Sequence, residues 1–142
     1  MKLSTIKRND RSTTGVWWDF ETGQRLDKPN EHLCVRIAEK DNPQHRASLA
    51  RLQLEHVEAL RQGGDAAAAA WQRIVTRALS ESILVDWANV DGDDDQPIAY
   101  TADAAEKVLA DATLWPFRHF VEDTAGIIRS YRLEHEEAAK GN

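Results

Sequence analysis

The sequence predicts a mainly α-helical α+β domain, in which a small antiparallel β-hairpin or meander is followed by about four helices. Short runs of aromatic and β-branched residues, separated by turn residues, occupy residues 15–40. Apolar residues spaced by three and four positions then recur over residues 42–133. The 142 residues suffice for one ordinary domain. We therefore expect a single globular domain over 15–133, between a flexible basic N-terminus (1–14) and a frayed, charged C-terminus (134–142).

Two segments, Gly15–Phe20 and His32–Ile37, have the composition of antiparallel strands. In the second segment alternate residues are apolar, so their side chains share one face of the strand. Trp17 and Trp18 are consecutive and must point to opposite faces, so we expect one in the core and the other partly exposed. A further short strand is predicted at Leu3–Lys7.

Two helices are predicted in the middle of the chain. Asn42 is a good N-cap, and Pro43 is tolerated in a first turn, so the first helix begins there. Gly63-Gly64 ends it. Asp65 is expected to cap the second helix, which contains the alanine run Ala66–Ala70. The expected buried stripe of this second helix comprises Trp71, Ile74, Val75, Ala78, Leu79 and Ile83.

A fixed corner between two helical halves is predicted around the acidic turn Asp91–Asp95. The apolar residues from Leu84 to Trp87 are interpreted as the end of the second helix. Gly92 and Pro97 in the turn disfavour regular structure. Beyond the turn the chain returns to the core. We expect the residues of this structural corner to share the core with the last helix; they are Trp87, Ile98 and Tyr100.

Two more helices complete the predicted fold. Thr101 is a good N-cap for the first of them. The second opens near Leu114, because Pro116 fits a first helical turn. The residues expected to face inward are Ala104, Ala105, Val108 and Leu109 in the first helix, and Phe117, Phe120, Val121, Thr124, Ile127, Ile128 and Tyr131 in the second.

Composition favours a cytoplasmic protein. Charged residues make up 30% of the chain, and the mean hydropathy is −0.59. No apolar run approaches the ~20 residues that a membrane span needs, and the N-terminal residues are too polar for a secretory signal. The single cysteine, Cys34, excludes an intramolecular disulfide.

The charge is distributed unevenly. Residues 1–61 contain 11 Lys+Arg and 9 Asp+Glu, a balance of +2, whereas residues 62–142 contain 7 and 15, a balance of −8. A general nucleic-acid binder needs a dense basic face, so we expect no nucleic-acid partner and no membrane partner. The asymmetry is compatible with a protein partner or with self-association of unlike ends.

The sequence offers no recognisable catalytic, cofactor or metal site. His119 and Glu122 lie three apart on a predicted helix, but no second such pair could complete a di-iron site. The acidic turn has the first spacings of a calcium loop, yet its sixth position is Gln96 instead of Gly and its twelfth is Ala102 instead of Glu. Cys34 lies mid-strand with no evident base. Nucleophile elbows and phosphate loops are absent. We therefore expect a protein that is not an enzyme and needs no cofactor.

Several motifs resemble those of the tail assembly chaperones of long-tailed bacteriophages and prophages. In that group a Leu-x-x-Trp segment leads through an acidic turn and a Pro-Ile/Leu-x-Tyr/Phe-Ser/Thr step to a helix rich in Ala and Leu. An Asn-Pro-x-x-Arg-x-x-Leu helix start and a closing Phe-x-x-Phe helix are also similar. The matching residues here are Leu84–Trp87, Asp91–Asp95, Pro97–Thr101, Ala104–Leu109, Asn42–Leu49 and Phe117–Glu122, and the resemblance covers about residues 15–130.

The resemblance implies a small non-catalytic protein of the bacterial host cytoplasm. It would coat the long tape-measure protein, and contact tail-tube subunits, until the tube polymerises. From the residues themselves, we expect the partner-binding surface to lie on the N-terminal sheet and the adjoining helix, where Trp and Arg side chains can act as anchors. The predicted partner-binding residues are Trp17, Trp18, Arg36, Lys40, Arg46 and Arg51.

Two alternatives remain open from the sequence. The first is a virion structural component, such as a head–tail connector or tail-completion protein. The second is a small DNA-binding regulator that uses the basic N-terminal arm.

Overall fold

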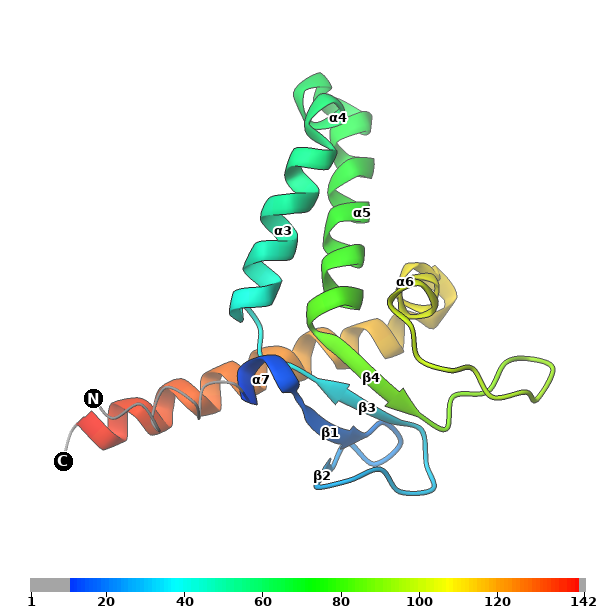
Figure 1. Cartoon of the computed structure of the whole chain (residues 1–142), viewed down its shortest axis with the longest axis vertical. Helices are drawn as coiled ribbons and strands as arrows, with labels where there is room; N and C mark the ends of the chain where they lie inside the picture. The colour runs from blue at the N-terminus through cyan, green and yellow to red at the C-terminus, as the bar shows by residue number, and fades with distance from the viewer. Residues whose placement is uncertain (1–10, 141–142) are drawn as a thin grey trace.

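The computed structural model describes residues 11–140 and contains a four-stranded antiparallel sheet beside several helices (Figure 1). A helical turn, α2 (Arg11–Thr14), precedes the sheet within the segment predicted to be flexible. The α+β, mainly α-helical fold class is confirmed, whereas the strand predicted at Leu3–Lys7 lies outside the described residues. The strands are β1 (Val16–Asp19), β2 (Arg25–Leu26), β3 (Cys34–Ile37) and β4 (Leu84–Ala88), in the spatial order β2-β1-β3-β4.

Strand β4 is the main departure from the sequence-based prediction. The residues from Leu84 to Trp87, interpreted as the end of a helix, form a strand instead. Trp87 lies opposite Val35 and Leu84 lies opposite Ile37. A short apolar run can be a buried strand or a buried helix by its pattern alone. Because three of the four residues of β3 are buried, its backbone groups need partners on both edges, and pairing with β4 supplies those of one edge.

Helices α3 (Pro43–Glu55), α4 (Val57–Gln62) and α5 (Gly64–Ser82) form a stalk that projects from the body of the molecule (Figure 1). Asn42 caps α3 as predicted, since its Oδ1 accepts hydrogen bonds from the backbone N–H groups of Gln44 and His45 at 2.9 and 3.0 Å. Its Nδ2 donates to the carbonyl oxygens of Glu39 and Ser82 at 2.8 and 3.0 Å. One buried side chain therefore ties together the two ends of the stalk at its base.

The turns of the stalk differ from the prediction in two places. The first helix does not continue to the glycine pair but breaks at His56, between α3 and α4. Gly63, with φ of +69°, is the N-cap of α5, and Asp65 lies in the first turn instead of capping it. A positive φ favours glycine, so backbone freedom at Gly63 sets the start of α5.

The stalk has a small core of its own, formed by Leu52, Ile74 and Ala78 with partly buried neighbours on α3 and α4. Ile74, Ala78, Leu79 and Ile83 of α5 are buried as predicted. Trp71 and Val75, placed in the same stripe by the sequence, are 43% and 37% exposed. The fold leaves both side chains partly open to solvent, and Val75 lines an open pocket at the base of the stalk.

The main core lies between the sheet and the C-terminal helices α6 (Ala102–Ala110) and α7 (Trp115–Lys140), which the 3-10 turn η1 (Ala112–Leu114) connects. Thr101 caps α6 as predicted and accepts a hydrogen bond from the Ala104 N–H at 3.0 Å. The buried residues of this core are Val35, Ile37, Leu79, Ile83, Leu84, Trp87, Ala105, Leu109, Phe117, Val121 and Ala125.

Helix α7 is longer than the sequence predicts. Its backbone stays helical to Lys140, past residue 133, where the domain is predicted to end. Ile127, predicted to face inward, is 59% exposed, whereas the next residue, Ile128, packs against the main core, so Ile127 lies on the outward side of the helix. The side chain of Tyr131 lies outside the described part of the structure.

The predicted corner exists, but one of its three residues acts through its backbone. Trp87 is 6% exposed, and its ring meets that of Tyr100 edge-on at a centroid distance of 5.4 Å. The Trp87 Nε1–H donates to the carbonyl oxygen of Ile98 at 2.8 Å. The Ile98 side chain, predicted to be in the core, is 36% exposed. The Tyr100 hydroxyl lies 2.6 Å from the Leu84 carbonyl oxygen, and burial raises the pKa of Tyr100 to about 12.

Candidate functional site

An open, mostly apolar groove of about 650 Å³ lies at the corner. The end of the sheet, the corner loop and the start of α7 build it. Its lining is mostly apolar, which is the character of binding sites for other molecules. The apolar residues that line it are Phe20, Leu33, Trp87, Val90, Ile98, Val108, Leu114, Pro116 and Phe117.

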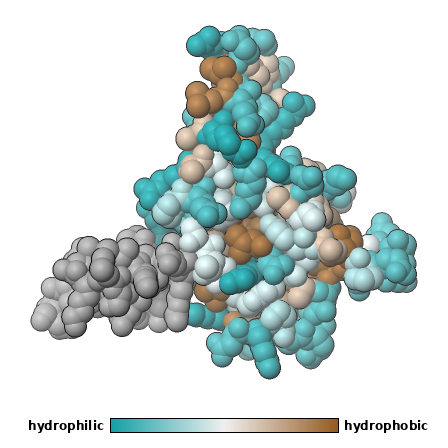
Figure 2. All heavy atoms as spheres, in the orientation of Figure 1, coloured by the Kyte–Doolittle hydropathy of each residue, from teal (hydrophilic) through white to brown (hydrophobic). Residues whose placement is uncertain are grey.

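The rim of the groove carries exposed apolar side chains. Leu114 is 42% exposed, and Ile98 is 36% exposed. Next to Leu114 in the chain, Trp115 is 61% exposed and lies edge-on to the His119 ring at 5.3 Å. Figure 2 shows a hydrophobic patch in this region, between α6 and the hydrophilic turn at the right edge of the view. Contiguous exposed apolar surface of this kind marks sites of association.

The floor of the groove is held in place by packing. The Phe20 ring lies 5.5 Å from that of Phe117 and 5.3 Å from that of Phe120, in tilted and edge-on arrangements. The hydrogen bond from Trp87 Nε1–H to the Ile98 carbonyl oxygen fixes the Trp87 ring as well. These side chains are therefore ordered before any partner arrives, which lowers the entropy lost on binding.

The acidic turn forms one side of the groove, since Asp91 and Asp93 line it. Its backbone is a closed hairpin in which the Gly92 N–H donates to the Gln96 carbonyl at 2.9 Å and the Ile98 N–H donates to the Val90 carbonyl at 2.8 Å. The turn is thus a fixed feature of the surface. It projects away from the body in Figure 1.

Hydrogen bonds around Asp19 hold the part of the groove that Phe20 and Leu33 line. Asp19 is 2% exposed, and its carboxylate accepts hydrogen bonds from Asn30 Nδ2 at 2.9 Å and from Glu21 N–H at 2.8 Å, and lies 2.8 Å from His32 Nδ1. The Asn30 bond, with the others, holds the pKa of Asp19 below its usual value against the effect of burial. The Asp19 bond raises the pKa of His32. Cys34 Sγ donates to Asn30 Oδ1 at 3.1 Å, so this cysteine has a structural role in the same cluster.

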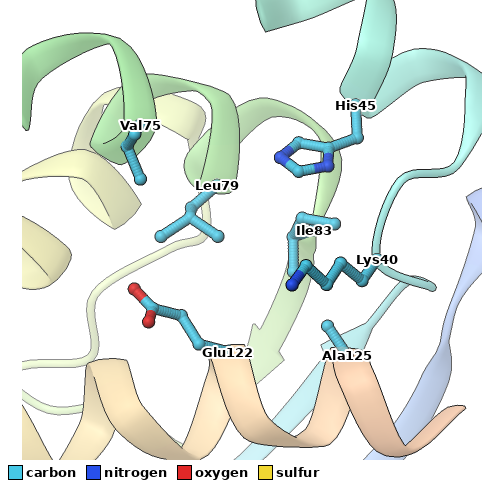
Figure 3. A pocket seen from close by; sticks show the side chains of 7 residues that line it. All are labelled: Lys40, His45, Val75, Leu79, Ile83, Glu122 and Ala125. Carbon is cyan, nitrogen blue, oxygen red and sulfur yellow. The ribbon is translucent and has the colours of Figure 1, made fainter. Parts of the chain in front are cut away.

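A smaller pocket of about 240 Å³ lies at the base of the stalk, between α3, α5 and α7 (Figure 3). The side chains of Lys40, His45 and Glu122 surround an apolar floor there. The His45 Nδ1 accepts a hydrogen bond from the Asp41 N–H at 3.2 Å, and burial lowers the pKa of His45. Glu122 is paired with Arg118 at 2.8 Å. The polar groups of this pocket are therefore largely used within the fold.

The structure does not bring the six predicted partner-binding residues into one surface. Trp18 packs against the main core, while Trp17 is half-buried on the opposite face of the sheet, next to Arg36 on β3. Arg51 lies on the stalk and is paired with Glu81 and Glu55. The other two are separated as well: Lys40 lines the pocket at the stalk base, and Arg46 is exposed on α3.

The groove itself was not predicted from the sequence. Its residues come from five separate segments, which only the fold brings together. One signal was present: Leu114 and Trp115 precede the buried stripe of the last helix, and their exposure follows from that position.

The described residues contain neither a metal-binding cluster nor a membrane-spanning helix. No group of three or more His, Cys, Asp or Glu side chains there is placed to hold a metal ion. None of the helices in residues 11–140 combines the length and hydrophobicity needed to cross a bilayer.

Fold and groove together define a small α+β domain with a projecting helical stalk and an apolar groove beside an acidic turn. The family model of the YdaY prophage protein matches residues 40–142, and the chain belongs to this family of prophage proteins. The match includes the stalk, the acidic turn and the C-terminal helices. No curated protein and no solved structure matches the chain.

Proposed function

We propose that this prophage protein is a non-catalytic tail assembly chaperone of the host cytoplasm. Its client is the tape-measure protein, with tail-tube subunits as a second contact. The motifs shared with tail assembly chaperones motivate the assignment, and membership of a prophage family is compatible with it. The observation that carries it is the preformed apolar groove at the corner.

The chemistry of such a client fits an open groove. A long helical protein exposes apolar side chains at spacings of three and four, and these dock into grooves of matching character. An open groove contacts a helix along one face only. The polymerising tube can therefore displace the chaperone from its client. The client site proposed here is the groove with its exposed rim, Ile98 and Leu114.

The surface predicted from the sequence is a separate candidate. Trp17 lies opposite Arg36 in the sheet, on the face away from the main core. It is half-buried, so it presents less surface than Trp115 does. Trp17→Ala therefore serves as a test of the sheet face, independent of the groove.

Co-expression with the tape-measure gene of the same prophage tests the proposal. Leu114→Asn removes an apolar rim contact without adding charge, and Leu54→Asn makes the same change at a 76% exposed position on the stalk. We expect the parent and Leu54→Asn to keep the client soluble and to co-purify with it, and Leu114→Asn to lose both. If all three behave alike, the groove is not the client site. Recovery of the protein from purified virions would instead indicate a structural component.

A further inference from the structure

We infer that the groove binds an amphipathic helix whose apolar stripe is flanked by Lys or Arg side chains. The aspartates of the acidic turn attract these basic side chains and so select this helix over an acidic one. The inference rests on the proposed function for the helical nature of the client. It adds the chemical class of the segment that binds. The groove supplies the apolar contact, and the carboxylates on one side of it decide which helix fits.

The charge of the groove has one sign. Its lining includes Asp91 and Asp93 and no Lys, Arg or His. Two further carboxylates, Asp94 and Asp95, follow in the same exposed turn. A partner with basic side chains at this edge would gain attraction on approach, and an acidic one would be repelled.

The four carboxylates of the turn lie within five consecutive residues without a counter-charge beside them. Among the residues that the structure describes, none of these four aspartates takes part in an ion pair. Other carboxylates are neutralised within the fold: Arg77 alone contacts Glu81, Asp103 and Glu106 at 2.7–2.8 Å. The like charges of the turn are thus left for a partner to neutralise.

The turn holds these charges at a fixed place. The Asp95 N–H donates to the Gly92 carbonyl at 3.0 Å, and Asp94 Oδ1 accepts from the Gln96 N–H at 3.1 Å. A Cβ at Gly92 would come within 2.9 Å of Asp94 Oδ1, so a side chain there would displace this carboxylate. Preorganised charges of this kind favour selectivity and fast association.

The shape of the site favours a helix over a small molecule. The exposed apolar surface continues from the hollow onto its rim, where Ile98 and Leu114 are 36% and 42% exposed. A small ligand inside the hollow would leave that surface uncovered. A helix laid across the groove covers both, because its side chains at i, i+3, i+4 and i+7 form a stripe.

Two synthetic helical peptides test the inference. Each has ~18 residues, because isolated helices begin to be stable at about this length. Both carry the same Leu stripe; the remaining positions are mainly Lys in one and mainly Glu in the other. Binding of each labelled peptide to the whole protein is measured by fluorescence anisotropy at low and at physiological ionic strength. We expect the Lys peptide to bind about tenfold more tightly at low salt, and this ratio to fall as salt screens the charges.

Paired variants assign the effect to the turn. Asp93→Asn with Asp95→Asn should weaken binding of the Lys peptide about fivefold, as the loss of two exposed charges does. Glu58→Gln with Asp65→Asn removes two exposed carboxylates from the stalk and should leave binding unchanged. Leu114→Asn should weaken both peptides, whereas Leu54→Asn should not.

Three results would overturn the inference. They are equal or tighter binding of the Glu peptide, no binding of either peptide, and a concentration-dependent dimer that Leu114→Asn dissolves. The last would identify a second copy of this chain as the occupant. Solubility of the tape-measure client is measured separately, so a client held by the groove without preference between the peptides would leave the proposed function standing.

Discussion

At the scale of single residues, three side chains hold the candidate site in shape. Trp87 lies under the groove and bonds the corner loop through the Ile98 carbonyl. The Asp19 carboxylate bonds His32 and so holds the loop that carries it, next to the wall formed by Phe20 and Leu33. The Phe20 N–H donates to the Leu33 carbonyl at 2.9 Å, which connects that wall to the sheet.

Trp87→Ala is expected to lower the free energy of unfolding by ~3–5 kcal/mol, because it removes a large aromatic side chain from the core. Urea denaturation measures the change. Trp115→Ala, at a 61% exposed position, is the control and should change the value by less than about 0.5 kcal/mol. Losses of equal size in the two variants would contradict the packing described for the corner.

His32 should stabilise the fold most at acidic pH. Its carboxylate neighbours are Asp19, Glu21 and Glu31, and its pKa is raised, chiefly by the Asp19 bond. A group with a raised folded-state pKa contributes fully below its unfolded value of about 6.5 and loses that contribution as pH rises through the folded value. Asp19, whose pKa is lowered, loses its own contribution only as pH falls well below the usual carboxyl range.

Denaturation of the parent and of His32→Gln between pH 5 and pH 9, a range about two units either side of the usual His value, measures this dependence. The difference between the two proteins should be largest at the acidic end and should shrink toward the basic end. His119→Gln, on the exposed side of α7, is the control. A difference that grows with pH would mean that His32 is not held in its charged form.

At the scale of elements, the sequence defined the caps better than the ends of the helices. Asn42 and Thr101 act as N-caps because their side chains satisfy orphan N–H groups locally. Local chemistry could not reveal that Leu84 to Trp87 form a strand, because that depends on β3, some fifty residues earlier in the chain. It also could not show that Trp71 and Val75 lack a covering helix, or that five segments meet at the groove.

Asn42→Ala is expected to destabilise the fold by about 2–3 kcal/mol, since it removes a helix cap and two hydrogen bonds from a buried side chain. Thr101→Ala removes a cap at an exposed position and should cost about 1 kcal/mol. Thermal denaturation of both variants gives the comparison. Equal losses would indicate that the bonds from Asn42 to Glu39 and Ser82 add nothing.

The acidic turn should not bind calcium. Gln96 and Ala102 stand where a calcium loop needs Gly and a bidentate Glu. Millimolar calcium is therefore expected to leave the melting temperature unchanged. A ligand present at 100 times its Kd would stabilise the fold by about 2.7 kcal/mol, which a melting curve detects readily. A clear upward shift would show that the turn is a cation site after all.

At the scale of the whole molecule, the chain divides its apolar residues between two cores. The main core joins the sheet to α6 and α7, and the stalk has its own cluster around Ile74. Fewer buried residues support the outer stalk, where α4 has none that is fully buried. The two parts should therefore differ in local stability.

Hydrogen exchange should resolve this difference. We expect amides of residues 57–70 to exchange about tenfold or more faster than those of β3 and the first half of α7. Ile74→Ala, which opens a cavity in the stalk cluster, should accelerate exchange in the stalk while leaving β3 largely unaffected. Uniform rates, or equal acceleration in both parts, would show that the molecule opens as one unit.

Asn42 bonds both ends of the stalk at its base, so the helical hairpin projects with its far end free (Figure 1). Its nineteen-residue arm, α5, is about 28 Å long, so a rotation of about 10° at the base moves the free end by about 5 Å. The fastening combines the Asn42 bond to Ser82, the bridges from Arg77 to Asp103 and Glu106, and the burial of Leu79 and Ile83 in the main core. A load applied at Leu54 near the free end would therefore act on these contacts at the base as a torque, multiplied by the length of the arm.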